Sequence, residues 1–218
     1  MKKIINYLLA AIAVLSTFAA NAGPMGYKDS WMMMGDISSN WREVFANYAI
    51  TPRDAFGVSN TYMRSDNHTT ADNVSEVTYT RLLHRWNEKN SQTNVWFMGG
   101  IGSAAIHEQN KNNEIKTIAS PGIQFDYETT RLYFATTGRF YRASNLNHDY
   151  RSIKGGFSFY EPHYSETQPW FILEARRMTD LSATTEVTPM LRLINKSYFV
   201  EAGISNSHEL RFNFMAIF

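Results

Sequence analysis

Residues 208–218 read HELRFNFMAIF, and this stretch decides the fold. From Leu210 onward the even-numbered positions are apolar or aromatic, whereas the odd-numbered positions include Glu209, Arg211 and Asn213. Successive side chains of a β-strand point to opposite faces. A period of two therefore predicts a strand with one apolar face and one polar face.

The same alternation continues upstream along nearly the whole chain, and helical periodicity is absent. We expect strands near residues 30–37, 41–51, 55–64, 75–86, 92–104, 115–127, 131–142, 150–160, 168–177, 186–194, 197–205 and 208–218. These twelve strands form an even number, as in bacterial single-chain membrane barrels. Because the first segment is the weakest, ten strands is the alternative.

The links between these segments are of two kinds. Short links fall at 52–54, 128–130 and 195–196, and longer polar links fall at 65–73, 108–114, 144–149 and 179–185. Outer-membrane barrels typically have short periplasmic turns and longer outer loops, so we expect the short links at the periplasmic end and the longer links outside. Two links depart from the rule. The link at 161–167 is long for a periplasmic turn, and the link at 38–40 is short for an outer loop.

The two faces of the expected strands, formed by alternate residues, differ sharply in chemistry. One is crowded with aromatic and aliphatic side chains, and the other carries full charges at Glu43, Lys116, Asp126, Arg139, Lys154, Glu174, Arg192, Glu201 and Arg211. A water-soluble β-sandwich also alternates and is the competing interpretation. A transmembrane barrel explains both faces at once, because its interior faces an aqueous lumen and its exterior faces lipid. The nine charged positions are therefore the candidate lumen-lining residues.

The final strand also carries a resemblance. Residues 208–218, ending in Phe218, resemble the C-terminal strand signature of Gram-negative outer-membrane β-barrel proteins. The resemblance implies that Phe212, Phe214 and Phe218 form the signal read by the outer-membrane barrel assembly machinery. It also implies contact with outer-membrane lipid and lipopolysaccharide.

The first 22 residues read as a secretory signal peptide. Lys2 and Lys3 precede an apolar stretch at 4–14, and Ala20-Asn21-Ala22 supplies a small-x-small cleavage pattern. An uncleaved membrane anchor is the alternative reading. We expect residues 23–218 to form the barrel domain, exported to the cell outer membrane of a Gram-negative bacterium.

Composition excludes several classes of protein. The 218 residues contain no Cys, which excludes disulfide frameworks, thiolate metal sites and Cys nucleophiles. The net charge of +1 gives no field suited to nucleic acid, so no nucleic-acid partner is expected. No mature segment is apolar for long enough to be a transmembrane helix, which excludes a helical transporter.

The barrel class leaves three functions open. Twelve strands of about ten residues leave roughly 75 mature residues for all connections, too few for a large plug domain. A narrow porin-like lumen that passes or binds a small polar solute is the first hypothesis. A non-conducting metal-binding barrel and a purely structural barrel, in which the lumen charges only neutralise one another, are the alternatives.

The metal hypothesis rests on a cluster of methionines. Residues 30–36 read SWMMMGD and place Met32, Met34 and Asp36 on one face, and thioethers are suitable ligands for Cu(I). The stretches GPMGYKDSWMMMGD and TPRDAFG are weakly similar to small outer-membrane proteins associated with copper-handling genes. Histidines near expected outer loops could add to a copper or zinc site: His68, His107, His148 and His208. Adaptable interior packing is the alternative role of the methionines.

An enzyme is not expected. His163-Tyr164-Ser165 is similar to the His-x-Ser element of outer-membrane lipid A deacylases, in which His activates Ser. The expected topology places these residues at the periplasmic end, away from the outer leaflet where that chemistry works. Position 177, where a downstream acid could be sought, is Arg.

Overall fold

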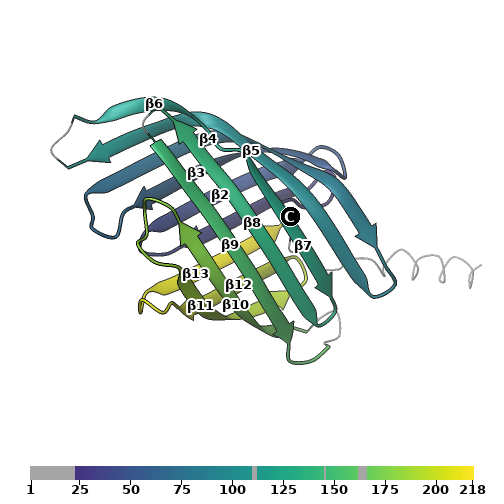
Figure 1. Cartoon of the computed structure of the whole chain (residues 1–218). Coiled ribbons are helices and arrows are strands. Elements are labelled where there is room, and N and C mark those ends of the chain that lie inside the picture. Colours follow the sequence, from purple (N-terminus) through teal and green to yellow (C-terminus); the bar gives the residue numbers. More distant parts are fainter. Residues whose placement is uncertain (1–22, 110–111, 145, 162–165) are drawn as a thin grey trace, which may run out of the picture.

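The computed structural model describes residues 23–109, 112–144, 146–161 and 166–218, and these form one closed antiparallel β-barrel (Figure 1). Its strands are β1 (Trp31–Ile37), β2 (Trp41–Ala49), β3 (Asp54–Arg64), β4 (Thr70–Asn87), β5 (Ser91–Glu108), β6 (Glu114–Ala119), β7 (Gly122–Thr129), β8 (Leu132–Ala143), β9 (Leu146–Ser158), β10 (Gln168–Met178), β11 (Glu186–Asn195), β12 (Tyr198–Ile204) and β13 (Leu210–Ile217). The all-β barrel class is confirmed. Among the described residues, no helix is long and apolar enough to cross a membrane.

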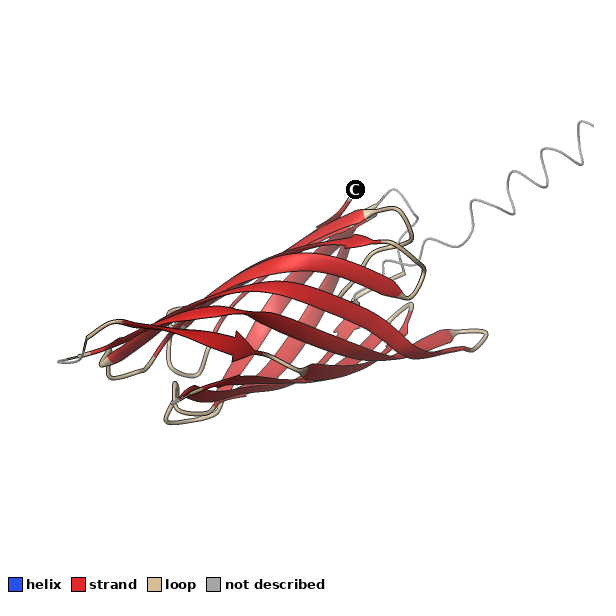
Figure 2. Cartoon of the chain, turned by 90° about the horizontal axis from the view of Figure 1, so that it is seen from above, coloured by secondary structure: helices blue, strands red, loops and turns tan. Residues whose placement is uncertain are grey.

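The first and last strands close the barrel. Met33 of β1 is the register partner of Ala216 in β13, and Asp36 is the partner of Asn213. Apart from β5 with β7 and β6 with β8, the other neighbours in the wall are consecutive along the chain, and each pairing is antiparallel. Figure 2 shows the tilted strands wrapping into this single wall.

The wall has twelve strand positions, because β6 and β7 are two halves of one strand. Both halves pair with β5 and with β8. The predicted count of twelve is confirmed, but the single strand expected at 115–127 is interrupted at Ser120-Pro121. Pro121 has no N–H to donate to a ladder, which is why the strand breaks there. Its carbonyl still accepts from the Phe140 N–H, at 2.9 Å.

The structure lengthens several strands at the expense of predicted loops. Strands β4 and β5 have 18 residues each, and residues 70–73 of the loop expected at 65–73 belong to β4. The loop expected at 144–149 is also largely strand, with His148 paired to Tyr141 across β8 and β9. Polar residues predict loops in soluble sheets, but in a barrel with a polar interior they continue the strand. The loop expectation was therefore wrong at these two places.

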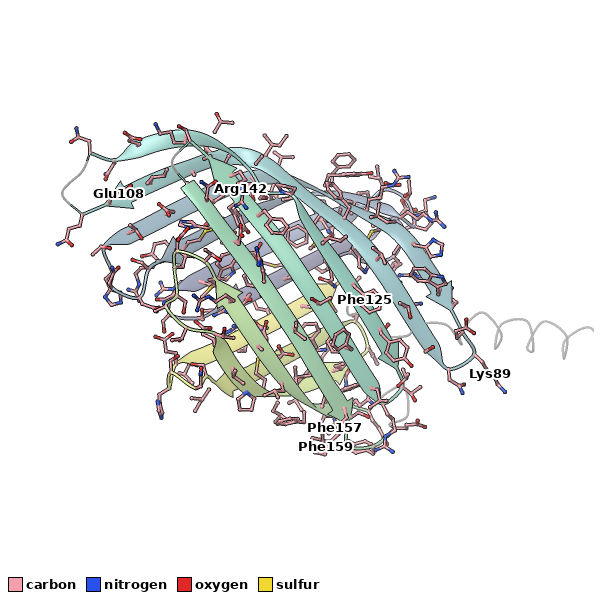
Figure 3. All side chains as sticks on the ribbon, in the orientation of Figure 1. Lys89, Glu108, Phe125, Arg142, Phe157 and Phe159 are labelled. Atoms are coloured by element: carbon pink, nitrogen blue, oxygen red, sulfur yellow. The ribbon has the colours of Figure 1, made fainter. Side chains whose placement is uncertain are left out.

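The two ends of the barrel hold different parts of the chain. The terminal end is where β1 begins and β13 ends, and the distal end holds residues 38–40, 65–69 and 179–185. Figure 3 shows Lys89 in the turn at the terminal end and Glu108 at the distal end of β5. Large apolar side chains are exposed around the whole exterior, including Val58, Val77, Ile123, Ile153, Leu173, Leu191 and Phe212. The interior holds the buried polar and charged groups.

Candidate functional site

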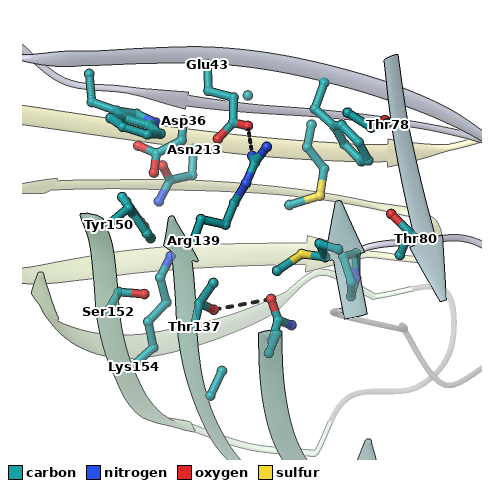
Figure 4. Close-up of a pocket in the computed structure, with 18 of the residues that line it drawn as sticks. Asp36, Glu43, Thr78, Thr80, Thr137, Arg139, Tyr150, Ser152, Lys154 and Asn213 are labelled. Carbon is teal, nitrogen blue, oxygen red and sulfur yellow. Dashed lines mark hydrogen bonds and ion pairs between the residues drawn. The ribbon is translucent and has the colours of Figure 1, made fainter. Parts of the chain in front are cut away.

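A cavity of about 170 Å³ lies in the middle of the lumen (Figure 4). It is bordered by side chains from both sides of the barrel, among them Trp41 and Tyr150 toward the distal end and Pro24 toward the terminal end. Five charged side chains also line it: Asp36, Glu43, Arg139, Lys154 and Arg192. The cavity therefore offers a small solute both signs of charge.

Arg139 spans the lumen. It extends from β8 and binds Glu43 of β2, with 2.6 Å between Nη1 and Oε1, although the two strands are five positions apart in the wall. Its Nη2 lies 3.3 Å from Glu76 Oε2 of β4 and 3.1 Å from the Ser120 hydroxyl oxygen. A single guanidinium therefore ties three wall strands together across the interior.

A second group of charges lies on the opposite side of the lumen, between β1 and β10–β13. Arg211 Nη2 lies 3.0 Å from Asp36 Oδ1 and 3.1 Å from Glu174 Oε2. Arg176 binds Glu186 through Nη2 at 2.5 Å, and its Nη1 lies 3.7 Å from Asp36. Both arginines are almost fully buried, so removing one partner would leave a buried charge uncompensated.

Lys154 and Arg192 extend this group toward the terminal end. The Lys154 ammonium lies between two carboxylates, 3.6 Å from Glu174 and 3.5 Å from Glu201. Arg192 Nε donates to Glu201 at 2.6 Å, and its guanidinium carbon lies 4.7 Å from the ring centres of both Tyr133 and Phe199. We call this continuous set the charged track: Asp36, Lys154, Glu174, Arg176, Glu186, Arg192, Glu201 and Arg211.

Two of the nine predicted lumen residues lie apart from these groups. Asp126 is buried near the terminal end and accepts hydrogen bonds from the side chains of Asn94 and Trp96, each at 2.6 Å. Lys116 lies near the distal end, partly exposed, and its Nζ is 2.8 Å from Glu114. The structure brings the other seven together as Arg139 with Glu43, and Lys154, Glu174, Arg192, Glu201 and Arg211 in the charged track.

Four buried charges in the lumen were not predicted: Asp72, Glu76, Arg176 and Glu186. Asp72 lies in a stretch expected to be a loop, at 65–73. Arg176 shares the parity of Glu174, Glu76 shares that of the buried Thr78, and Glu186 begins β11. The same alternation that selected the other nine could have found Arg176 and Glu76. Glu186 was assigned to the first position of a strand, where burial is not evident from sequence.

The distal part of the lumen is filled by apolar side chains. Trp41 packs against Tyr141 and Tyr150, with ring centres 5.7 Å and 5.0 Å apart. The full distal layer is Trp41, Met63, Val74, Ala104, Ile118, Tyr141, Leu146, Tyr150, Met178 and Leu181. These residues come from β2 through β10 and the following loop. On the remaining side of the lumen, toward β11–β1, Arg176 instead binds Glu186 and the Ser38 hydroxyl.

The terminal part of the lumen is filled by a segment that precedes the barrel wall. Residues 23–26 are buried, and we call them the inserted segment. Met25 packs with Ala49, Ala55, Leu82 and Trp96. The Asn47 side-chain amide donates to the Pro24 carbonyl at 2.9 Å. The chain reverses before β1 with Asp29 at φ 64°, in the left-handed region. Sequence analysis did not predict this insertion.

The proposed methionine ligands lie in the barrel interior. Met32 is fully buried with Phe199, Met215 and Ile217, and Met34 packs against the same cluster. Asp36 belongs to the charged track, where its carboxylate binds Arg211. Among the described residues, no group of three or more His, Asp or Glu side chains has a geometry suited to a metal ion. Copper binding stays a prediction.

The predicted rim histidines do not form one group. His68 and His208 occupy turns with positive φ, and His107 lies in β5. His148 was expected in a loop, but it lies in β9 and faces the interior, where Nε2 is 2.9 Å from Asp72 Oδ2. Residues 163–165, weighed as a catalytic element, and the predicted signal peptide at 1–22 lie outside the described residues.

No family model and no curated protein matches the chain. Among solved structures, it is similar to "KdgM porin in complex with disordered oligogalacturonate", with a TM-score of 0.49 and 12% identity over 87% of this chain and 98% of that one. It is also similar to a loop L8 deletion mutant of OmpT, an outer membrane protein of Vibrio cholerae, with a TM-score of 0.32 and 8% identity over the same shares.

Proposed function

We propose that this chain is an outer-membrane β-barrel with a narrow, porin-like lumen that passes or binds a small polar solute. Its exterior supports the membrane placement, because large apolar side chains are exposed around the whole wall while charges are gathered inside. In water that arrangement would expose a contiguous apolar surface far larger than soluble monomers carry. In a bilayer it is the expected one.

The charged track is the observation that carries the solute hypothesis. It runs past the distal layer from Arg176 and Glu186 to Arg192, and three of its members, Asp36, Lys154 and Arg192, border the central cavity. Paired charges of both signs along one side of a lumen give a polar or charged solute successive places to exchange hydrogen bonds. The cavity, about 170 Å³, is smaller than the pockets of about 300–1,000 Å³ that hold drug-sized ligands, which supports a small solute.

The same proposal includes assembly and no catalysis. Phe212 and Phe218 are exposed on the exterior of the closing strand, with 41% and 69% of their surface accessible. This supports their role, with Phe214, as the signal read by the barrel assembly machinery. We propose no reaction, because most of the interior charges are engaged in ion pairs.

Single-channel conductance in planar bilayers tests the solute hypothesis. We expect small discrete steps from the refolded protein, and Lys154→Gln should shift ion preference toward cations because Glu174 and Glu201 lose their shared ammonium. Lys116→Gln is the matched control, since Lys116 lies outside the track. A silent bilayer with folded protein would overturn passage through the lumen, and equal shifts in both variants would overturn the role of the charged track. Adding Cu(I), Cu(II) or Zn(II) tests the metal prediction separately.

A further inference from the structure

The exterior of β8–β10 carries an unusual group of positive charges. Arg142, Arg151 and Arg177 all point outward and are exposed. Arg151 and Arg177 are direct register partners on neighbouring strands. Like charges placed directly opposite one another destabilise a sheet. The Arg151–Arg177 pair therefore does not stabilise the sheet, and its presence points to a role other than stability.

One acid partly compensates these arginines. Asp149 binds Arg142 at 2.5 Å through Oδ1 and Arg151 at 2.9 Å through Oδ2. Arg177 instead donates to the Ala183 carbonyl at 2.7 Å. The four side chains, which we call the exterior arginine cluster, therefore have a net charge of +2. Both guanidinium groups bound to Asp149 also lie near the Phe140 ring, at 5.6 Å and 5.9 Å.

The cluster lies near the distal end of the wall, the end whose longer loops are expected to face the cell exterior, and its position fits a membrane interface there. Figure 3 shows Arg142 near the distal end of its strand and Phe157 and Phe159 toward the opposite end. Leu132 and Arg142 are ten residues apart on the same exterior face of β8, which corresponds to about 25 Å of height for a tilted strand. That is about the height of the apolar band of a membrane barrel. Ile153 and Leu173 lie within this span.

We propose that the exterior arginine cluster binds the phosphate of an outer-leaflet glycolipid of the lipid A type. A planar guanidinium group can bind a phosphate through two parallel hydrogen bonds. Arg142, Arg151 and Arg177 lie close together here, beside an apolar surface that suits acyl chains. This inference rests on the outer-membrane placement in the proposed function. It gives the expected contact with lipopolysaccharide a specific binding site, outside the lumen.

Native mass spectrometry of the full mature protein with bisphosphorylated lipid A tests the site. We expect Arg151→Gln combined with Arg177→Gln to weaken retention of the lipid by about tenfold to thirtyfold. The matched control is Arg42→Gln combined with Arg81→Gln, which removes two exterior arginines elsewhere and should change retention little. Equal loss in both double variants, or full retention in the first, would overturn the proposal.

Two further arms identify the ligand chemistry. Dephosphorylated lipid A should bind the unaltered protein as weakly as lipid A binds the Arg151→Gln/Arg177→Gln variant. Displacement of lipid A by equimolar inorganic phosphate would assign the site to free phosphate and contradict the lipid. Insertion into vesicles is scored separately by protease protection. Intact insertion without lipid A retention would contradict this site alone, whereas failed insertion would contradict the membrane placement.

Discussion

The two ends of the lumen are filled in different ways. The distal layer consists of side chains that belong to the wall itself, such as Trp41, Tyr141 and Met178. The inserted segment at the terminal end belongs to no strand and is held by a small apolar contact around Met25 and one hydrogen bond from Asn47. The distal layer cannot leave without disrupting the wall. The inserted segment can leave while the wall stays closed.

This difference assigns separate tasks to the two ends. The distal layer is placed to stabilise the barrel and to confine solutes to the charged track beside it. The inserted segment borders the central cavity through Pro24 and is placed to control access from the terminal end. Mutations at the two ends should therefore change different observables.

The largest expected effect is on stability, from the distal layer. Trp41→Ala removes a buried ring that packs on Tyr141 and Tyr150 and should lower the free energy of unfolding by about 3–5 kcal/mol. Denaturant unfolding in micelles measures it. Trp31→Ala is the control, because Trp31 is half exposed on the exterior. An equal loss of unfolding free energy in both variants would mean that a Trp in the distal layer stabilises the barrel no more than a Trp on the exterior.

Deleting residues 23–26 should have a smaller effect on stability and a larger one on access. The deletion loses the contacts of Met25 but breaks no strand pairing, so we expect a loss of about 2 kcal/mol, the lower end for a buried Met side chain. Because the chain has no Cys, Ser152→Cys gives a single reporter at the cavity. A charged thiol reagent added at the terminal end should label it several times faster after the deletion. Unchanged labelling would show that the segment does not restrict access.

The sequence predicted the wall much better than the contents of the lumen. Alternation identified the strands and placed residues such as Arg139 and Glu174 on the inner parity. It could not show that Arg139 meets Glu43, because that contact depends on how the wall closes across several strands. Nor could it predict the inserted segment, since Gly23-Pro24-Met25-Gly26 has no period and its burial depends on a cavity that other residues form.

The smallest expected effect tests whether the segment is in equilibrium between an inserted and a released position. Asn47→Ala removes the hydrogen bond to the Pro24 carbonyl, a contribution of about 1 kcal/mol. If the segment opens and closes faster than the reagent reacts, this change raises the released fraction, and so the labelling of Ser152→Cys, about fivefold. Global unfolding should shift little, because most of the surface buried in the wall is unaffected. In the protein lacking residues 23–26, Asn47→Ala should no longer change labelling, since its partner is gone. A persistent increase in that background would mean that Asn47 acts on the wall and not on the segment, and the two ends would then differ less than their packing indicates.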